Sequence, residues 1–199
     1  MRIETLGRFK RVSLSPAEYF ASADSVTIST LLGSCVAACL FDPVRRIVGM
    51  NHFLLGNRRY AKEMPISATE AGRYGVHAME LLINEMMRLG AARKNLRAKA
   101  FGGATIISNS SEAGNFLCVG EINARFIREF LTNEGIPLLA EDLGGEKGRV
   151  IHFSNGDFAV LVRKIEQNRS QRLARRDREV WRRAIERQEA TMPSVDLWR

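Results

Sequence analysis

The hydrophobic pattern near the start of the chain predicts a buried hairpin. Residues 36–41 are apolar at every position, which is typical of a strand covered on both faces. The pair Asp42-Pro43 then predicts a turn, and a second strand-like run follows at residues 47–55. We expect these two runs to pair as neighbouring antiparallel strands.

Two segments carry apolar residues at helical spacing. The first covers residues 69–89, with Thr69 as a candidate cap and Gly90 at its end. The second covers residues 120–133 and ends before Gly135. Their apolar stripes are formed by Val76, Met79, Leu82, Ile83, Met86 and Leu89, and by Ile122, Phe126, Ile127, Phe130 and Leu131. Each helix is therefore expected to bury one face.

The remaining hydrophobic runs predict further strands. The first four lie at residues 26–28, 96–101, 136–141 and 149–154, and Asn155-Gly156 signals a hairpin into a fifth at residues 157–165. The order of strands, helix, strand, helix and strands lacks the regular alternation of a doubly wound fold. We therefore predict an α/β (α+β) layered domain, in which helices pack on a mixed, largely antiparallel sheet.

The pattern divides the chain into three parts. Residues 1–24 are weakly patterned and are expected to form an N-terminal arm. Residues 25–165 form the folded domain, and residues 166–199 a basic C-terminal extension that is helical or disordered. Residues 163–199 hold eleven Lys/Arg against six Asp/Glu, a net +5 of the formal +8. This charge fits either a solvated segment or contact with an acidic partner or an anionic membrane surface. Nucleic acid is not favoured, because no recognition motif is present.

The composition of the 199 residues, 45% hydrophobic and 26% charged, is ordinary for a soluble globular protein with a full core. No apolar run approaches the roughly 18 residues that cross a bilayer. The charged start of the chain lacks the apolar centre of a signal peptide. Three cysteines, an odd number, fit a reducing compartment. We therefore expect a cytoplasmic protein.

Cys35 and His52 are the strongest candidates for chemistry. If residues 42–45 form a four-residue turn, counting back along the hairpin places Cys35 opposite His52, with Cβ atoms roughly 4.5–5.5 Å apart. A histidine at that distance can take the proton of a thiol, whose unperturbed pKa is about 8.5. A slip of one residue would place Cys35 opposite Phe53 and turn His52 to the other face. The pattern favours neither register, and a buried cysteine is also commonly a small core residue.

Small and hydroxyl-bearing residues precede Cys35. Gly33 and Ser34 allow a tight approach in which backbone N–H groups face a developing oxyanion. Ser29 and Thr30 carry hydroxyls that can orient the imidazole. These residue types by themselves do not establish an enzyme, because they also occur in buried structural segments.

Cys39 suggests a second interpretation, in which it pairs with Cys35. Four residues of a strand span about 13 Å, whereas the Cα atoms of a disulfide lie about 4.4–6.8 Å apart. The spacing is also too long for shared ligation of zinc. We therefore expect Cys39 to be a core residue, and we expect no metal and no cofactor.

Short motifs run in a fixed order through residues 16–164. They are Leu32-Gly-Ser-Cys-Val36, Asp42-Pro43, Gly49-Met-Asn-His-Phe53, Arg73-Tyr-Gly75, Ala78-Met79, Lys99-Ala-Phe-Gly-Gly-Ala104, Gly135-Ile-Pro137, Asp142-Leu-Gly-Gly145 and Gly148-Arg149. In this order they resemble the chemotaxis protein CheD family of chemoreceptor glutamine deamidases. A Gly-Ser-Cys motif alone would be weak, but the ordered set is specific.

The resemblance implies a layered sandwich like that of other cysteine amide deamidases. It also implies hydrolysis of glutamine side chains to glutamate, with release of ammonia, in the cytoplasmic part of chemoreceptors. Cys35 would attack the amide carbon and His52 would move the proton. The family's third residue is a threonine six positions before the cysteine, which is Ser29 here, with Thr30 as its neighbour. An arginine often precedes the family's equivalent of Asn123, where this chain has isoleucine.

A binding role is the alternative function. The CheD family is also known to bind the chemotaxis phosphatase CheC, so the chain could serve as an adaptor of a CheC-like phosphatase with minor catalysis. The presence of both Cys35 and His52 favours retained chemistry. Any membrane contact would be peripheral, through the receptor or the basic C-terminal extension.

Overall fold

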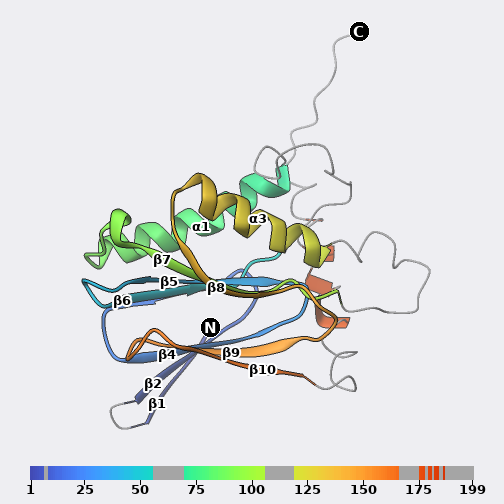
Figure 1. Ribbon diagram of the computed structural model, residues 1–199. Helices are drawn as coiled ribbons and strands as arrows, with labels where there is room; N and C mark the ends of the chain where they lie inside the picture. Colours follow the sequence, from blue (N-terminus) through green and yellow to red (C-terminus); the bar gives the residue numbers. More distant parts are fainter. Residues whose placement is uncertain are drawn as a thin grey trace, which may run out of the picture.

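The computed structural model describes residues 1–6, 9–55, 70–105 and 119–165, together with several positions between 175 and 186. Three layers are visible in Figure 1: two five-stranded sheets face each other, and two long helices cover the outer face of one of them. Six of the eight strand pairings are antiparallel and two are parallel. The predicted layered fold with mixed, largely antiparallel pairing is confirmed, although the strands form two sheets.

The helix-covered sheet carries the predicted hairpin. Its strands, in spatial order, are β3 (Tyr19–Ser22), β6 (Ile47–Asn51), β5 (Val36–Asp42), β7 (Arg97–Gly102) and β8 (Leu138–Leu143). Strand β5 is central, and all seven of its residues are buried. Its continuous apolar run is explained because one face meets the helices and the other meets the second sheet.

The second sheet contains the start of the chain. Its strands, in order, are β1 (Arg2–Leu6), β2 (Phe9–Leu14), β4 (Val26–Leu32), β9 (Arg149–Ser154) and β10 (Val160–Lys164). Residues 1–24, expected as an arm, instead supply β1, β2 and β3, and β2 pairs in parallel with β4. Val12 and Leu14 of β2 are buried between the sheets, which explains why this segment is ordered.

The two helices form as their apolar stripes predict. Helix α1 covers Glu70–Arg88 and α3 covers Val119–Asn133, and a 3-10 turn lies between them at Arg93–Asn95. Gly90 and Gly135 follow the two helices with positive φ values of 105° and 64°, as expected for glycine after a helix. The proposed cap Thr69 lies outside the described residues. Both helices pack on one core with the covered sheet, through residues that include Met79, Leu82, Ile83, Met86, Phe126, Ile127 and Phe130.

A separate apolar core fills the space between the sheets. We call it the intersheet core; its residues include Val12, Ile28, Leu32, Cys35, Ala37, Cys39, Val48, Met50, Ile151 and Phe153. Alternate residues of β5 divide between the two cores, since Ala37 and Cys39 face the second sheet while Ala38 and Leu40 face the helices. The face of β5 that carries Cys35 is therefore the one between the sheets.

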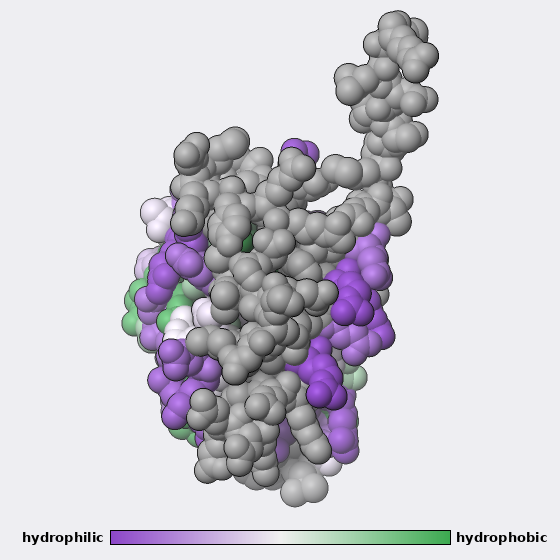
Figure 2. All heavy atoms as spheres, turned by 90° about the vertical axis from the view of Figure 1, so that its right-hand side faces the viewer, coloured by the Kyte–Doolittle hydropathy of each residue, from purple (hydrophilic) through white to green (hydrophobic). Residues whose placement is uncertain are grey.

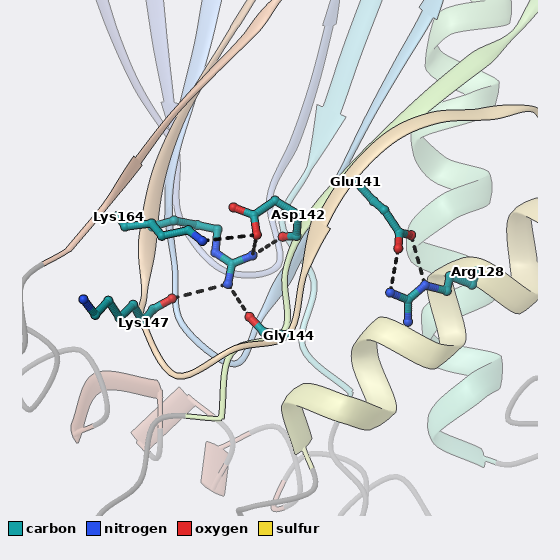
Figure 3. Close-up of polar contacts among 7 residues, drawn as sticks. Arg128, Glu141, Asp142, Gly144, Lys147 and Lys164 are labelled. Carbon is teal, nitrogen blue, oxygen red and sulfur yellow. Dashed lines mark hydrogen bonds and ion pairs between the residues drawn. The ribbon is translucent and has the colours of Figure 1, made fainter.

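A buried arginine on β9 connects the two sheets at the edge strand β8. Arg149, at the start of β9, is 1% exposed, and its Nη1 lies 3.1 Å from Oδ1 of Asp142 in β8. Its guanidinium also donates to the carbonyl oxygens of Asp142, Gly144 and Lys147 (Figure 3). The amide of Gly144 in turn donates to the carbonyl of Gly102, at 2.8 Å. The Asp142-Leu-Gly-Gly145 and Gly148-Arg149 motifs therefore act as a structural connection that reaches the end of β7.

The coloured part of the face drawn in Figure 2 is mainly hydrophilic. Among the residues coloured there, purple spheres outnumber the green ones, which gather mostly at the left edge. Ion pairs such as Arg128–Glu141, at 2.8 Å, contribute to the polar surface (Figure 3). Within the described residues, no helix has the length and apolar character needed to span a membrane.

Short helical pieces between residues 175 and 186 lie beside the sheets, near the beginning of α3 (Figure 1). Asp177 is fully buried, and Val180 packs against the intersheet core. At this point the C-terminal segment is therefore in contact with the folded domain.

Candidate active site

The register of the hairpin places Cys35 and His52 on one face. Asp42 pairs with Ile47, and an isolated bridge joins Val36 to Phe53, so Cys35 lies two residues away from the position opposite His52. Neither of the two registers considered from the sequence is observed, since the pairing differs by two residues from the one that would place Cys35 opposite His52; a shift of two residues preserves the face. Cys35 and His52 are therefore diagonal neighbours on one face of the hairpin.

The turn explains this shift. Residues 43–46 form the loop, because the carboxylate of Asp42 accepts hydrogen bonds from the amides of Val44, at 2.8 Å, and Arg45, at 3.0 Å. Asp42 therefore remains the last residue of β5, and the loop begins one position later than expected.

Cys35 is held as a neutral thiol in this arrangement. Its side chain is completely buried. Burial raises the pKa of the Cys35 thiol well above its ordinary value, the carboxylate of Asp177 raises it further, and the guanidinium of Arg176 opposes the rise. A base must therefore remove the proton as the thiol attacks.

His52 has the protonation pattern of such a base. Its Nδ1 lies 2.7 Å from the hydroxyl oxygen of Thr30, and this hydroxyl donates its own proton to the carbonyl of Leu14, at 2.8 Å. The Thr30 oxygen therefore accepts a hydrogen bond from Nδ1–H, which leaves the lone pair on Nε2. Among the described residues, no group forms a hydrogen bond to Nε2.

Burial also keeps His52 uncharged. The imidazole is 1% exposed, and burial together with the nearby charge of Arg176 lowers its pKa to about 3. The imidazole is therefore neutral at physiological pH, with its Nε2 lone pair free of a proton.

Ser29 does not make the hydrogen bond expected of it. Its hydroxyl lies 2.7 Å from Nδ1 of His152, the residue directly opposite it on β9. Thr30, one residue later on β4, points to the opposite face and reaches His52 across the intersheet space. The hydroxyl that contacts His52 is therefore that of Thr30.

The loop before Cys35 is fixed by the end of β7. Gly102 has φ +114°, and a Cβ added there would lie 2.2 Å from the carbonyl oxygen of Cys35. The amide of Gly103 donates to that oxygen at 2.7 Å, and the amide of Ala104 donates to the carbonyl of Gly33 at 2.8 Å. The Gly102-Gly103 pair is therefore required for the close approach of two backbones.

Asn123 connects the two strands that carry Cys35 and His52. It is fully buried on α3; its Nδ2 donates to the carbonyl of Ser34 at 2.9 Å, and its Oδ1 accepts from the amide of Leu55 at 2.8 Å. No role for this residue followed from the sequence. The available signal was an amide side chain that falls within the apolar face of a helix.

The backbone donor next to Cys35 is occupied. Oδ2 of Asp177 accepts hydrogen bonds from the amide of Ser34, at 2.8 Å, and from its hydroxyl, at 3.1 Å. Of the two candidate oxyanion residues, Ser34 thus presents its N–H to a carboxylate, whereas Gly33 contributes its carbonyl to the support of the loop. No local sequence pattern pointed to Asp177.

Cys39 lies deeper in β5 than Cys35. It is free and fully buried, and burial raises the pKa of its thiol far above the ordinary range. Cys118 lies outside the described residues. In the part of the chain that the structure describes, no three His, Cys, Asp or Glu side chains gather as they would around a metal ion.

Comparisons with known proteins identify the family. Residues 55–164 match the family described as CheD chemotactic sensory transduction. The whole chain is also 58% identical to the "Probable chemoreceptor glutamine deamidase CheD 1" of Geobacter sulfurreducens, of which it covers 98%. The chain belongs to the CheD family.

Two further CheD relatives match most of the chain. The "Probable chemoreceptor glutamine deamidase CheD 2" of Shewanella oneidensis is 47% identical over 78% of this chain and 77% of its own length. The "Probable chemoreceptor glutamine deamidase CheD" of Rhizobium etli is 49% identical over 75% of this chain and 77% of its own length. The family match begins after His52, whereas the Geobacter alignment spans the whole chain and so includes the region of Cys35.

Proposed function

We propose that this chain hydrolyses the side-chain amides of glutamine residues in chemoreceptors, producing glutamate and ammonia. The observation that carries the proposal is the fixed tautomer of His52, whose Nε2 has no hydrogen-bond partner among the described residues and lies on the same face as Cys35. The names of the CheD relatives support the substrate. Because the proposed substrate is the cytoplasmic part of a chemoreceptor, the chain is proposed to act in the cytoplasm.

The proposed reaction begins at the thiol. Sγ of Cys35 attacks the amide carbon while Nε2 of His52 takes the thiol proton. The carbonyl oxygen becomes an oxyanion, for which the amide of Ser34 is the proposed donor. The protonated imidazole then delivers its proton to the departing nitrogen, and ammonia leaves a thioester on Cys35.

Hydrolysis of the thioester completes the cycle. Water loses a proton to Nε2 of His52 as it attacks the thioester carbon, and the thiolate of Cys35 leaves and is reprotonated. The product is a glutamate carboxylate. Throughout, Thr30 rather than Ser29 is the proposed orienting group, because its hydroxyl keeps the proton of His52 on Nδ1.

The test uses purified chain and cytoplasmic fragments of chemoreceptors. Mass spectrometry of the fragments should show conversion of particular glutamines to glutamate, with an equal amount of ammonia released. Cys35→Ala should abolish both, and Cys39→Ala is the matched control that removes the other described thiol. Equal conversion by the Cys35→Ala variant would exclude the proposed nucleophile.

A CheC-like phosphatase remains a proposed partner through the family resemblance. The complete set of Cys35, His52 and Thr30 supports catalysis over a purely adaptor role. A pure adaptor would bind the phosphatase as well after Cys35→Ala as before it. Its wild-type form would also leave the receptor glutamines unmodified.

A further inference from the structure

Asp177 of the C-terminal segment lies in the candidate active site. Its carboxylate is fully buried and receives two hydrogen bonds from Ser34, the residue that precedes the nucleophile. Arg176 reaches the same region, since its Nη2 donates to the carbonyl of Leu31 at 3.0 Å and lies 3.9 Å from Oδ1 of Asp177. Oδ1 itself has no hydrogen-bond partner among the described residues.

This contact is chemically costly to the folded chain. A carboxylate loses its hydration on burial, and only part of that loss is replaced by the two hydrogen bonds from Ser34. The negative charge also lies close enough to oppose formation of the Cys35 thiolate. A catalytic role for Asp177 would thus work against the nucleophile.

The position of the carboxylate has a simple chemical meaning. The proposed reaction ends with a side-chain carboxylate whose oxygen lies at the donors that stabilised the oxyanion. Asp177 presents the same functional group to the proposed donor, the amide of Ser34. Aspartate and glutamate differ by one methylene, so Asp177 resembles the product of the reaction.

We propose that the C-terminal segment is an internal product analogue, in which Asp177 occupies the carboxylate subsite at Ser34 and must leave before a receptor glutamine can bind. This inference rests on the proposed function and adds to it a built-in competitor of the substrate. It also identifies the amide and hydroxyl of Ser34 as the subsite for the side-chain oxygen of substrate and product.

Among the described residues of the segment, contacts with the folded domain gather at Arg176, Asp177 and Val180. Besides Asp177 and Arg176, the described contact is made by Val180, which is only partly buried against the intersheet core. The other described positions of the segment are exposed: Arg175, Glu179, Arg182, Arg183 and Glu186. Among the described positions, only Val180 thus contributes partly buried apolar surface, and a contact that depends mainly on polar groups can open at a lower free energy than the core.

The first test measures access to Cys35 without any receptor. Full-length chain, Asp177→Ala, Asp177→Asn and Glu179→Ala are treated with iodoacetamide, and labelling of Cys35 and Cys39 is followed by mass spectrometry. Asp177→Ala should accelerate labelling of Cys35 by about tenfold or more, since the segment loses the two charged hydrogen bonds that hold it at Ser34. Asp177→Asn, which retains an acceptor for Ser34, should be intermediate, and the exposed Glu179→Ala should match the wild type.

Several results would overturn the inference. Unchanged labelling of Cys35 in Asp177→Ala would show that the carboxylate does not hold the segment in place. Equal acceleration at Cys35 and Cys39 would indicate general unfolding instead of release of the segment. If Asp177→Ala does not fold, Asp177→Asn provides the test. A labelling rate of Cys35 in Asp177→Asn equal to that of the wild type would contradict the inference.

The second test separates this inference from the proposed function. With receptor fragments, Asp177→Ala should lower the apparent KM and leave kcat unchanged, because an internal competitor affects only substrate binding. Deamidation with the same KM and the same labelling rate as the wild type would overturn the inference and leave the proposed function standing. If Asp177→Ala is labelled faster but neither it nor the wild type deamidates any fragment, the proposed function is refuted. If Asp177→Ala folds but has a lower kcat, the inference is overturned.

Discussion

The hydroxyl of Thr30 lies 2.7 Å from Nδ1 of His52 while donating its own proton to the carbonyl of Leu14. A single hydroxyl hydrogen cannot serve both neighbours, so the imidazole must supply the hydrogen of the contact with Thr30. The tautomer of His52 is thereby determined by a backbone carbonyl on β2. The start of the chain, which the sequence analysis treated as an arm, thus contributes to the candidate active site.

Removal of the Thr30 hydroxyl should impair turnover. We expect Thr30→Ala to lower kcat by about 10–100-fold, the range found for partners that orient a functional histidine, because the imidazole loses its fixed tautomer. Steady-state assays on receptor fragments measure this effect. Thr30→Ser should restore most of the activity.

Ser29→Ala is the matched variant for that experiment, since Ser29 contacts His152 and not His52. It should leave kcat close to the wild-type value. A larger loss in Ser29→Ala than in Thr30→Ala would contradict the assignment.

Asn123 should contribute to stability. Asn123→Ala leaves the carbonyl of Ser34 and the amide of Leu55 buried without these partners, and each unsatisfied group costs about 1–3 kcal/mol. Urea unfolding should show a free energy of unfolding lower by about 2–6 kcal/mol. Thr132→Ala, at an exposed position of the same helix, is the control and should change it little. Equal stability of the two variants would show that the Asn123 bridge is dispensable.

The stability of the chain should depend on pH through His52. Its pKa is about 3 in the folded chain against an ordinary 6.5, so the unfolded chain binds a proton that the folded chain excludes between these values. The contribution of this group is complete above about pH 6.5 and is lost as pH falls toward 3.

Urea unfolding at about pH 7.5 and about pH 5.5 measures this contribution. The free energy of unfolding attributable to His52 should fall by about 1 kcal/mol between the two conditions. His52→Gln cannot titrate and should reduce the pH dependence by that amount, so identical pH slopes in the two proteins would contradict the prediction.

Truncation after Gln167 tests the domain boundary. We predict a folded domain that is active on short soluble substrates, because every proposed catalytic group lies before that residue. The truncated form should bind anionic vesicles more weakly at low salt, since residues 168–199 carry a surplus of basic side chains. That difference should shrink as the Debye length falls from about 30 Å at 0.01 M to about 8 Å at 0.15 M salt. Aggregation of the truncated form would place the boundary at the end of the chain.

Local patterns were sufficient to predict most elements of the fold. The apolar run of β5, the stripe of α1 and the glycines that follow both helices depend on residues close together in sequence, and the structure confirms them. The β9–β10 hairpin is also confirmed, although β10 begins at Val160 because the strands rejoin through a hydrogen bond from the amide of Ser154 to the carbonyl of Ala159. The chemistry-bearing residues Cys35 and His52 could be chosen from their types and spacing.

The sequence by itself thus determined the elements and the residues available for chemistry, but not their partners. Ser29 and Thr30 are adjacent hydroxyl residues, and only the packing of β4 between β2 and β9 decides which one faces His52. Asp177 is 143 residues from Ser34, and no local pattern encodes a contact at that separation. Side-chain direction and long-range contact are set by how sheets and segments pack together, which is why the tertiary structure alone decided both the orientation of the imidazole and the occupant of the site.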